Sequence, residues 1–313
     1  MRLGVNYTNY AFPHCSLEGT GILRTLGRPG PSEIVSSQLR AMRRAGVTSI
    51  RLLIWFTANP SGQSWGVVGS AGGSAGGFRT NLGRFAHEVR AAGFGRLTIA
   101  FGPRGANSPF QDDFDPALID QDWQFIKAVR AIVTRDGPPS TRFDLLNEGA
   151  PSRYLKSSIR AQVDRYILRI YRSYVRRFGR TDVTVSAVGA KSPLDQGNRL
   201  DNLVTLLRQA NLPLPTYFDV HANFGAAGVS HAVADAERQL AAAGLHTPLV
   251  IGETAYDDAA VGRTLRAALT RYSGSIEEID EWYLRPGNSC PVDPPYTVRA
   301  YRHAFDEGTT ARS

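Results

Sequence analysis

Two glutamates of this sequence have the residue type and the setting for acid–base and nucleophilic chemistry. Glu148 ends the apolar stretch "DLLNE", and Glu253 ends the stretch "LVIGE" about a hundred residues later. Hydrolysis of a glycosidic bond needs two such carboxyl groups, because one protonates the leaving oxygen while the other attacks the anomeric carbon or activates water. A lone glutamate at the end of a strand more often caps a solvated edge. The interpretation therefore depends on a fold that brings Glu148 and Glu253 together.

The segments around these glutamates alternate between short apolar runs and longer runs of helical periodicity. The apolar runs are rich in Val, Ile, Leu and aromatic residues, as strands buried on both faces should be. Strands are predicted at 2–7, 48–55, 96–102, 142–148, 183–189, 217–223, 249–254 and 275–284. Helices are predicted at 32–45, 81–92, 116–134, 157–178, 200–209, 230–243 and 258–271, with a last helix at 295–307. Gly46 and Gly93 supply stop signals after two of these helices.

Eight alternations of strand and helix predict an α/β fold of the (β/α)8 TIM-barrel class, with a single catalytic domain over residues 1–313. The alternative is a doubly wound open sheet, which would place a glycine-rich fingerprint directly after an early strand. The nearest candidate is "GSAGGSAGGF" at 69–78, well beyond the second strand. We interpret it as a flexible connector over the barrel mouth and not as a phosphate-binding loop.

In a TIM barrel the catalytic groups lie at the carboxyl ends of the strands. Asn147–Glu148 ends the fourth predicted strand, and Glu253 ends the seventh within "GET". This pair of motifs resembles that of the clan A glycoside hydrolases, a group of retaining enzymes that includes cellulases, β-xylosidases, β-galactosidases and arabinofuranosidases. The resemblance implies hydrolysis of a neutral oligo- or polysaccharide by double displacement. Glu148 would be the general acid/base and Glu253 the nucleophile, with their carboxyl groups about 5–5.5 Å apart.

The resemblance extends to other strand ends. It implies that Arg51 supports the nucleophile, that the Asn147 amide binds the sugar 2-hydroxyl, and that His221 matches the histidine of the sixth strand. Trp282 matches an aromatic platform for a sugar ring. Structural alternatives stay open for three of them: Arg51 as an ordinary ion-pair partner, His221 as a core histidine, and Trp282 as a packing residue of the rim.

The sequence also departs from the pattern of that clan. Gly149 follows the first glutamate where many members have Pro, and Asn223 stands where a Tyr often contacts the nucleophile. Asn223 is a candidate sugar-binding residue or a turn residue of its own loop. Tyr256 is the candidate replacement for the missing Tyr, and Trp55 is either a subsite residue or a loop anchor.

Two other functions compete with the hydrolase. A carbohydrate-binding or biosynthetic barrel of glycosidase ancestry would fit the change to Asn223. A metal-dependent hydrolase would need His and Asp clusters at several strand ends, yet of six histidines only His221 ends a predicted strand. The expectation is therefore an enzyme with no cofactor and no metal. The acidic residues 277, 278, 280 and 281 of the last strand need Arg partners wherever they face inward.

The net charge of +8 raises the question of a nucleic-acid partner. The basic residues are spread along the chain, and the densest run, 171–180, has the spacing of a solvated helix face. We therefore expect a carbohydrate substrate and no nucleic acid, with the oligomeric state open. No apolar run approaches the ~20 residues of a membrane span.

The amino-terminal residues lack the apolar region of a secretory signal, which indicates a cytoplasmic protein or a processed, secreted one. Cys15 and Cys290 follow the first and last predicted strands, which are neighbours in a closed barrel. They are either disulfide-bonded across that seam or two unrelated thiols.

Overall fold

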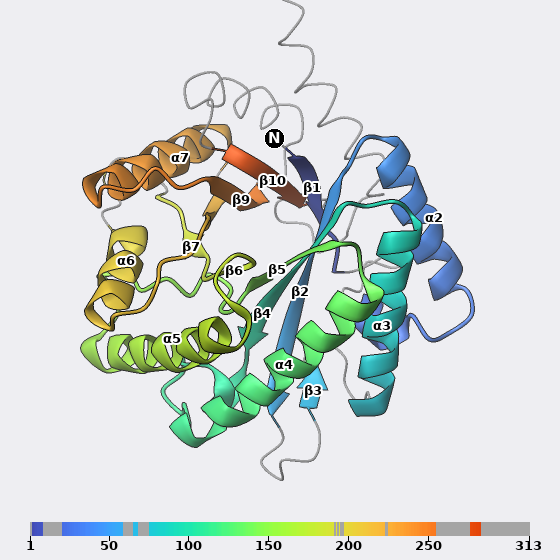
Figure 1. The fold of residues 1–313 in the computed structure, drawn as a ribbon, viewed down its shortest axis with the longest axis horizontal. Helices are drawn as coiled ribbons and strands as arrows, with labels where there is room; N and C mark the ends of the chain where they lie inside the picture. The colour runs from blue at the N-terminus through green and yellow to red at the C-terminus, as the bar shows by residue number, and fades with distance from the viewer. Residues whose placement is uncertain are drawn as a thin grey trace, which may run out of the picture.

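The computed structural model of the protein describes residues 2–8, 21–58, 65–67, 75–190, 192, 194, 197–222, 225–254 and 276–282. These residues form a curved sheet with helices on its outside, which confirms the α/β class (Figure 1). Nine parallel strands make up the sheet path: β1 (Arg2–Asn6), β2 (Ser49–Ala58), β4 (Arg96–Pro103), β5 (Ser140–Asp144), β6 (Val183–Thr184), β7 (Ala187–Val188), β8 (Phe218–Ala222), β9 (Leu249–Thr254) and β10 (Ile276–Trp282).

The order of the strands is β6-β5-β4-β2-β1-β10-β9-β8-β7, and β3 (Trp65–Val67) adds an antiparallel pairing to β2. The first and last strands of this path are separated in the chain by only Val185 and Ser186. β6 pairs with β5, whereas β7 pairs with β8. Both edges of the curved sheet therefore belong to one segment, 183–188.

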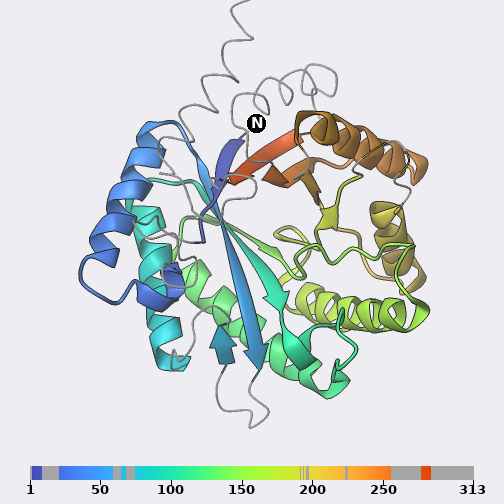
Figure 2. The same ribbon diagram turned by 180° about the vertical axis from the view of Figure 1, so that it is seen from behind.

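The described helices lie along the outer side of the curved sheet in both views (Figures 1 and 2). They are α1 (Ile22–Thr25), α2 (Pro31–Arg44), α3 (Ala75–Ala91), α4 (Ile119–Asp136), α5 (Ser157–Phe178), α6 (Arg199–Gln209) and α7 (Gly225–Ala242), with 3-10 turns η1 (Gly105–Asn107) and η2 (Pro116–Leu118) before α4. Gly46 and Gly93 adopt positive φ of 96° and 86° just after α2 and α3, as their predicted stop role requires. No helix within the described residues is long and apolar enough to cross a membrane.

The side chains of β2 point alternately toward the helices, where the hydrophobic core lies, and toward the concave face of the sheet. Leu52, Ile54 and Phe56 are buried in the main hydrophobic cluster, and the Phe56 ring stacks on Phe125 of α4 with centroids 4.4 Å apart. Since successive side chains of a strand point to opposite faces, Arg51 points away from the helices and into the curve. The apolar side chains of β2 thus contribute to the core, while Arg51, its single arginine, lies on the concave face of the sheet.

Two of the acidic residues of β10, Glu277 and Glu278, form ion pairs with arginines at the amino end of the sheet. Glu277 pairs with Arg96 (3.0 Å) and Arg142 (2.7 Å), and buried Glu278 also pairs with Arg96. The Arg142 guanidinium additionally lies 4.0 Å from the centroid of the Tyr217 ring. These pairs join β4, β5 and β10, so the last strand is connected to the opposite side of the sheet.

All eight predicted strand segments contain strands, but four local predictions need correction. The segment 183–189 is split into β6 and β7, because its two halves pair with different neighbours. β5 ends at Asp144, and Leu145–Glu148 form a turn in which Leu145 and Asn147 still donate to neighbouring strands. β3 was not predicted. α3 begins at Ala75, within the glycine-rich stretch that was expected to be a connector.

Several predictions concern residues outside the described ranges. These are the helices at 258–271 and 295–307, the site residues Asn223 and Tyr256, and the pair Cys15 and Cys290.

Candidate active site

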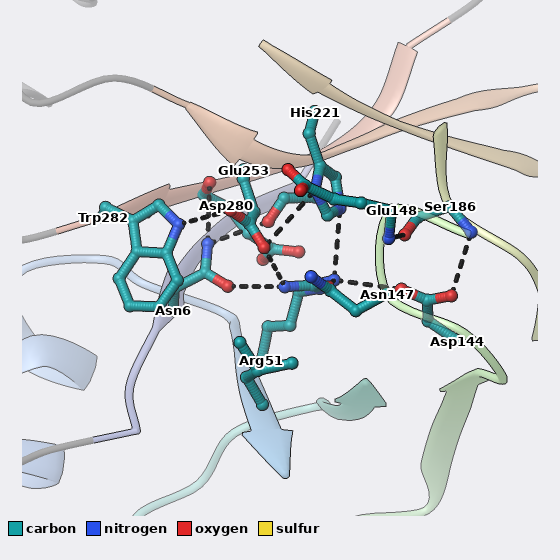
Figure 3. Close-up of polar contacts among 12 residues, drawn as sticks. Asn6, Arg51, Asp144, Asn147, Glu148, Ser186, His221, Glu253, Asp280 and Trp282 are labelled. Atoms are coloured by element: carbon teal, nitrogen blue, oxygen red, sulfur yellow. Dashed lines mark hydrogen bonds and ion pairs between the residues drawn. The ribbon is translucent and has the colours of Figure 1, made fainter. Parts of the chain in front are cut away.

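Glu148 and Glu253 meet at the carboxyl ends of the strands, as the sequence predicts (Figure 3). One carboxylate oxygen of Glu148, one of Glu253 and a ring nitrogen of His221 all lie within 4.8 Å of one another. His221 Nδ1 is 3.2 Å from Glu148 Oε1 and 3.4 Å from Glu253 Oε1. The two carboxyl groups thus share one imidazole nitrogen.

The turn after β5 positions Glu148. Its φ of 56° is unusual for a residue with a side chain, and its backbone N–H donates to Ser186 Oγ at 2.7 Å. The backbone N–H of Ser186 in turn donates to Asp144 Oδ1 at 2.9 Å. At Gly149 an added Cβ would lie 2.3 Å from Leu146 Cγ, so this turn has no room for a side chain there. The departure from Pro at this position therefore follows from the local backbone.

Arg51 is the centre of the polar network. It is fully buried, and its Nη1 donates to Asn6 Oδ1 and Glu253 Oε1, both at 3.0 Å. Its Nη2 donates to Asn147 Oδ1 at 2.7 Å and to Asp144 Oδ2 at 3.1 Å. The planar guanidinium with its five N–H groups suits such a set of acceptors. One side chain from β2 therefore fixes groups on β1, β5 and β9.

The two glutamates sit in different surroundings. Glu253 has a side chain only 8% exposed, and its Oε2 accepts a hydrogen bond from Trp282 Nε1 at 2.9 Å. Arg51 donates to its other oxygen, so each carboxylate oxygen of Glu253 receives at least one N–H donor. The Glu148 side chain is 42% exposed and contacts His221. Donors and a buried cation favour an ionised Glu253, whereas Glu148 remains open to solvent.

His221 is buried between charges of both signs. Burial disfavours its cationic form, but the Glu253 and Glu148 carboxylates outweigh that cost and raise the pKa of His221 to about 9. Its Nε2 lies 3.2 Å from Arg51 Nη2, a contact that is a hydrogen bond only when Nε2 carries no proton. The facing carboxylates hold a proton on Nδ1 in either charge state.

Asp219 supports the end of β9. Its Oδ1 accepts the Gly252 N–H at 2.9 Å, and a Cβ on Gly252 would come within 2.3 Å of that oxygen. Burial raises the pKa of Asp219 to about 6, while His221 and Arg51 act in the opposite direction. Asn6 Nδ2 donates to the Gly252 carbonyl at 2.8 Å. The glycine before the nucleophile candidate thus leaves room for Asp219.

In the part of the chain that the structure describes, two side-chain groups have the spacing of metal ligands: Glu148 with His221 and Glu253, and Asp144 with Asp219 and His221. Arg51 contacts members of both groups, with hydrogen bonds to Glu253 and Asp144. A metal cation bound by either group would therefore lie next to a buried guanidinium, and like-charge repulsion would oppose it.

The structure brings together most of the predicted site residues. Among the described residues, one network of hydrogen bonds and ion pairs contains Glu148, Glu253, Asn147, Arg51, His221 and Trp282. Trp55 lies further along β2, where Arg104 covers its ring. Four members of the network were not predicted from the sequence: Asn6, Asp144, Ser186 and Asp219. Asn6, Asp144 and Asp219 are polar residues in otherwise apolar strand segments, which is the signal that would have found them.

Comparisons with known proteins give similarity of structure alone. No family model matches the sequence, and no curated protein matches it. Among solved structures, GH5_18 from Bifidobacterium longum is 13% identical with a TM-score of 0.62, covering 100% of this chain and 80% of that one. The exo-beta-1,4-mannosidase Op5Man5 from an Opitutaceae bacterium is 14% identical with a TM-score of 0.60, covering 98% of this chain and 60% of that one.

The homocysteine methyltransferase MmuM from Escherichia coli is also similar, at 13% identity and a TM-score of 0.56, with 97% of this chain and 95% of that one covered. The similar structures thus include glycoside hydrolases and an enzyme of unrelated chemistry. At such identities the likeness shows a TIM-barrel type of fold and leaves the reaction to the site itself.

Proposed function

We propose that this protein is a retaining glycoside hydrolase of the clan A type that cleaves an oligo- or polysaccharide by double displacement. The observation that carries the proposal is the pair Glu148 and Glu253, with carboxylate oxygens within 4.8 Å of each other at the carboxyl ends of β5 and β9. Retaining enzymes place their two carboxyl groups about 5–5.5 Å apart, whereas inverting enzymes leave room for a water between them.

In this proposal Glu253 is the nucleophile. It attacks the anomeric carbon while Glu148 protonates the leaving oxygen, and water then hydrolyses the glycosyl–enzyme intermediate with Glu148 as the base. The bonds from Arg51 and Trp282 to Glu253 favour its charged form. The exposure of Glu148 suits a group that exchanges protons with the leaving group and with water.

The remaining predicted residues take supporting roles in the proposal. Asn147 binds the sugar 2-hydroxyl through its amide, since its carbonyl oxygen is fixed by Arg51 and its nitrogen is left to face the substrate. His221 holds both carboxyl groups in register. Asn223 and Tyr256 are kept as candidate substrate contacts.

The proposal includes a closed (β/α)8 barrel in a single domain over residues 1–313. Support comes from the two edges of the sheet, which share the segment 183–188. The similarity to TIM-barrel structures over nearly the whole chain adds to it.

The alternative is a barrel of the same ancestry that binds carbohydrate or serves biosynthesis without hydrolysis. This alternative is supported by the methyltransferase and a D-psicose 3-epimerase among the similar structures, because they show that folds of this type host other chemistries.

A panel of aryl glycosides tests the proposal: α and β, pyranose and furanose, pentose and hexose. The expected result is turnover of at least one member with retained anomeric configuration in the first-formed product, observed by NMR. Inverted configuration would remove the double-displacement mechanism, and no turnover with calorimetric sugar binding would favour the alternative.

A further inference from the structure

Trp55 and Arg104 form a stacked pair at the carboxyl ends of β2 and β4. Arg104 Cζ lies 3.6 Å from the centroid of the Trp55 ring. The backbone N–H of Arg104 donates to the Phe56 carbonyl at 2.9 Å, which fixes the start of the loop after β4. The ring also rests against Gly102, where an added Cβ would come within 2.0 Å of it. Gly102, two residues before Arg104, thus leaves the space that the Trp55 ring occupies.

Both residues lie on the face of the sheet that carries the candidate active site. Trp55 and Arg51 are four residues apart on β2, so they share a face and their Cα atoms are separated by ~13 Å along the strand. The intervening Leu52 and Ile54 face the helices in the hydrophobic cluster. The stacked pair therefore lies beyond Arg51 toward the mouth, where a neighbouring sugar unit of a bound chain would pass.

Among the described residues, no side-chain hydrogen bond engages the N–H edge of the Arg104 guanidinium. Within the described residues no carboxylate lies within ion-pair distance of it, in contrast to Arg51, Arg96 and Arg142. Burial lowers the pKa of Arg104 without an acidic neighbour to compensate. A guanidinium that stacks by its face keeps its N–H edge free for a bidentate contact with a carboxylate or a sulfate.

We propose that Arg104, held on Trp55, binds an anionic substituent on a sugar unit next to the one whose glycosidic bond is cleaved. The inference rests on the proposed function and names its substrate class: a glycan that carries carboxylate or sulfate groups. It replaces the neutral substrate that the sequence suggests. Trp55 acts in it as the support of Arg104, because one face of its ring is covered by the guanidinium.

The test uses matched aryl oligosaccharides of the sugar that the panel identifies. They differ only in the distal ring, which is neutral, a uronic acid or a 6-sulfate. For each protein the measured quantity is the ratio of kcat/KM on the anionic substrate to kcat/KM on the neutral one. We expect Arg104→Gln to lower this ratio ~10- to 100-fold, as the loss of a charge-assisted hydrogen bond predicts. Arg176→Gln removes the same charge from exposed α5 and should leave the ratio as in the wild type.

Trp55→Leu distinguishes two roles of this residue: support of the Arg104 side chain and direct stacking on a sugar ring. If Trp55 positions Arg104, the ratio falls in this variant as well, whereas direct stacking on sugar would lower both rates equally and keep the ratio. If the ratio falls only for the uronic acid substrate, the anionic group that Arg104 binds is a carboxylate. If it falls only for the sulfated substrate, that group is a sulfate ester. An unchanged ratio in Arg104→Gln, or an equal fall in Arg176→Gln, overturns the inference while hydrolysis stands.

If no glycoside is turned over, the proposed function fails separately. Calorimetry of a glucuronate-containing tetrasaccharide and a sulfated one of equal length then tests Arg104 by binding alone. Tighter binding to the wild type than to Arg104→Gln supports the subsite, and equal binding overturns it.

Discussion

Arg51 Nη1 lies 3.0 Å from Glu253 Oε1, across 202 positions of the chain, in a place where neither side chain is more than 8% exposed. Burial disfavours the charge on Arg51, but the carboxylates of Glu253, Asp219 and Asp144 outweigh it and raise the pKa of the arginine. Arg51 therefore remains a cation, and it is placed to keep Glu253 an anion.

Removal of either glutamate should abolish most of the hydrolysis. We expect Glu148→Ala to lower kcat/KM on an activated aryl glycoside by roughly 10²- to 10⁴-fold, as for a general acid/base, and Glu253→Ala to cost at least as much. Azide should partly restore Glu148→Ala, because a small anion can enter the vacated space. Glu33→Ala, an exposed glutamate of α2, is the control. Wild-type turnover in either site variant would exclude the assignment.

Arg51→Met should destabilise the fold strongly. It would leave the buried carboxylates of Asp144 and Glu253 without their cation, at a cost of about 3–5 kcal/mol in the free energy of unfolding. Arg169→Met breaks only the exposed pair with Asp120 and should cost about 0–1 kcal/mol. Urea unfolding measures both. If Arg51→Met does not fold, Arg51→Lys retains the charge and should still lower kcat/KM. A fully active and stable Lys variant would contradict the role of Arg51 as the centre of the polar network.

Trp282→Phe distinguishes the hydrogen bond of this residue from its ring. The indole N–H donates to Glu253 Oε2 at 2.9 Å, and Phe keeps an aromatic surface but has no donor. Because a hydrogen bond to a charged group contributes about 1.5–3 kcal/mol, kcat/KM should fall ~10- to 100-fold. Trp123→Phe on α4 is the matched control. Unchanged kinetics in Trp282→Phe would restore the interpretation of Trp282 as a stacking platform alone.

His221 should make stability depend on alkaline pH. Its pKa is raised from 6.5 to about 9 in the folded protein, so its contribution is fully present below pH 6.5 and is lost as the pH rises through 9. The slope is at most ~1.4 kcal/mol per pH unit. The difference in unfolding free energy between wild type and His221→Gln, measured by urea unfolding at pH 6.5 and at pH 9, should shrink across this window. A constant difference would contradict the bridging imidazolium.

Asp122 should act in a different way. It is fully buried on α4 with a hydrogen bond from Asn107, and burial raises its pKa from 3.8 to about 8. The folded state therefore holds a proton that the unfolded state releases, and stability should fall by up to ~1.4 kcal/mol per pH unit between pH 4 and 8.

Asp122→Asn should remove this loss and stabilise the protein at pH 8. The control is Asp120→Asn, two residues away on the same helix, with a side chain that is 65% exposed. Thermal or urea unfolding at pH 5 and pH 8 measures the effect; parallel pH profiles for wild type and Asp122→Asn would refute it.

The sequence alone determined the alternating elements, the position of Glu253 at the end of β9, and the place of Glu148 at the same side of the sheet, although Glu148 lies in the turn after β5 and not in the strand. It could do so because apolar runs and helical periodicity are local properties, and because the parallel strands of one sheet bring their carboxyl ends to the same side. The split of 183–188 was not predictable, since it depends on the two strands that flank that segment.

Only the tertiary structure decided which polar groups meet. Arg51 binds Asn6 and Glu253, which are 45 and 202 positions away, and Trp282 donates its indole N–H to Glu253, 29 positions away. Such contacts depend on the curvature of the sheet, the register of its strands and the rotamer of each side chain. None of these is encoded in a short window of sequence. The pair of carboxyl groups was therefore predictable, whereas the network of polar groups that keeps Glu253 ionised and holds both side chains in place was not.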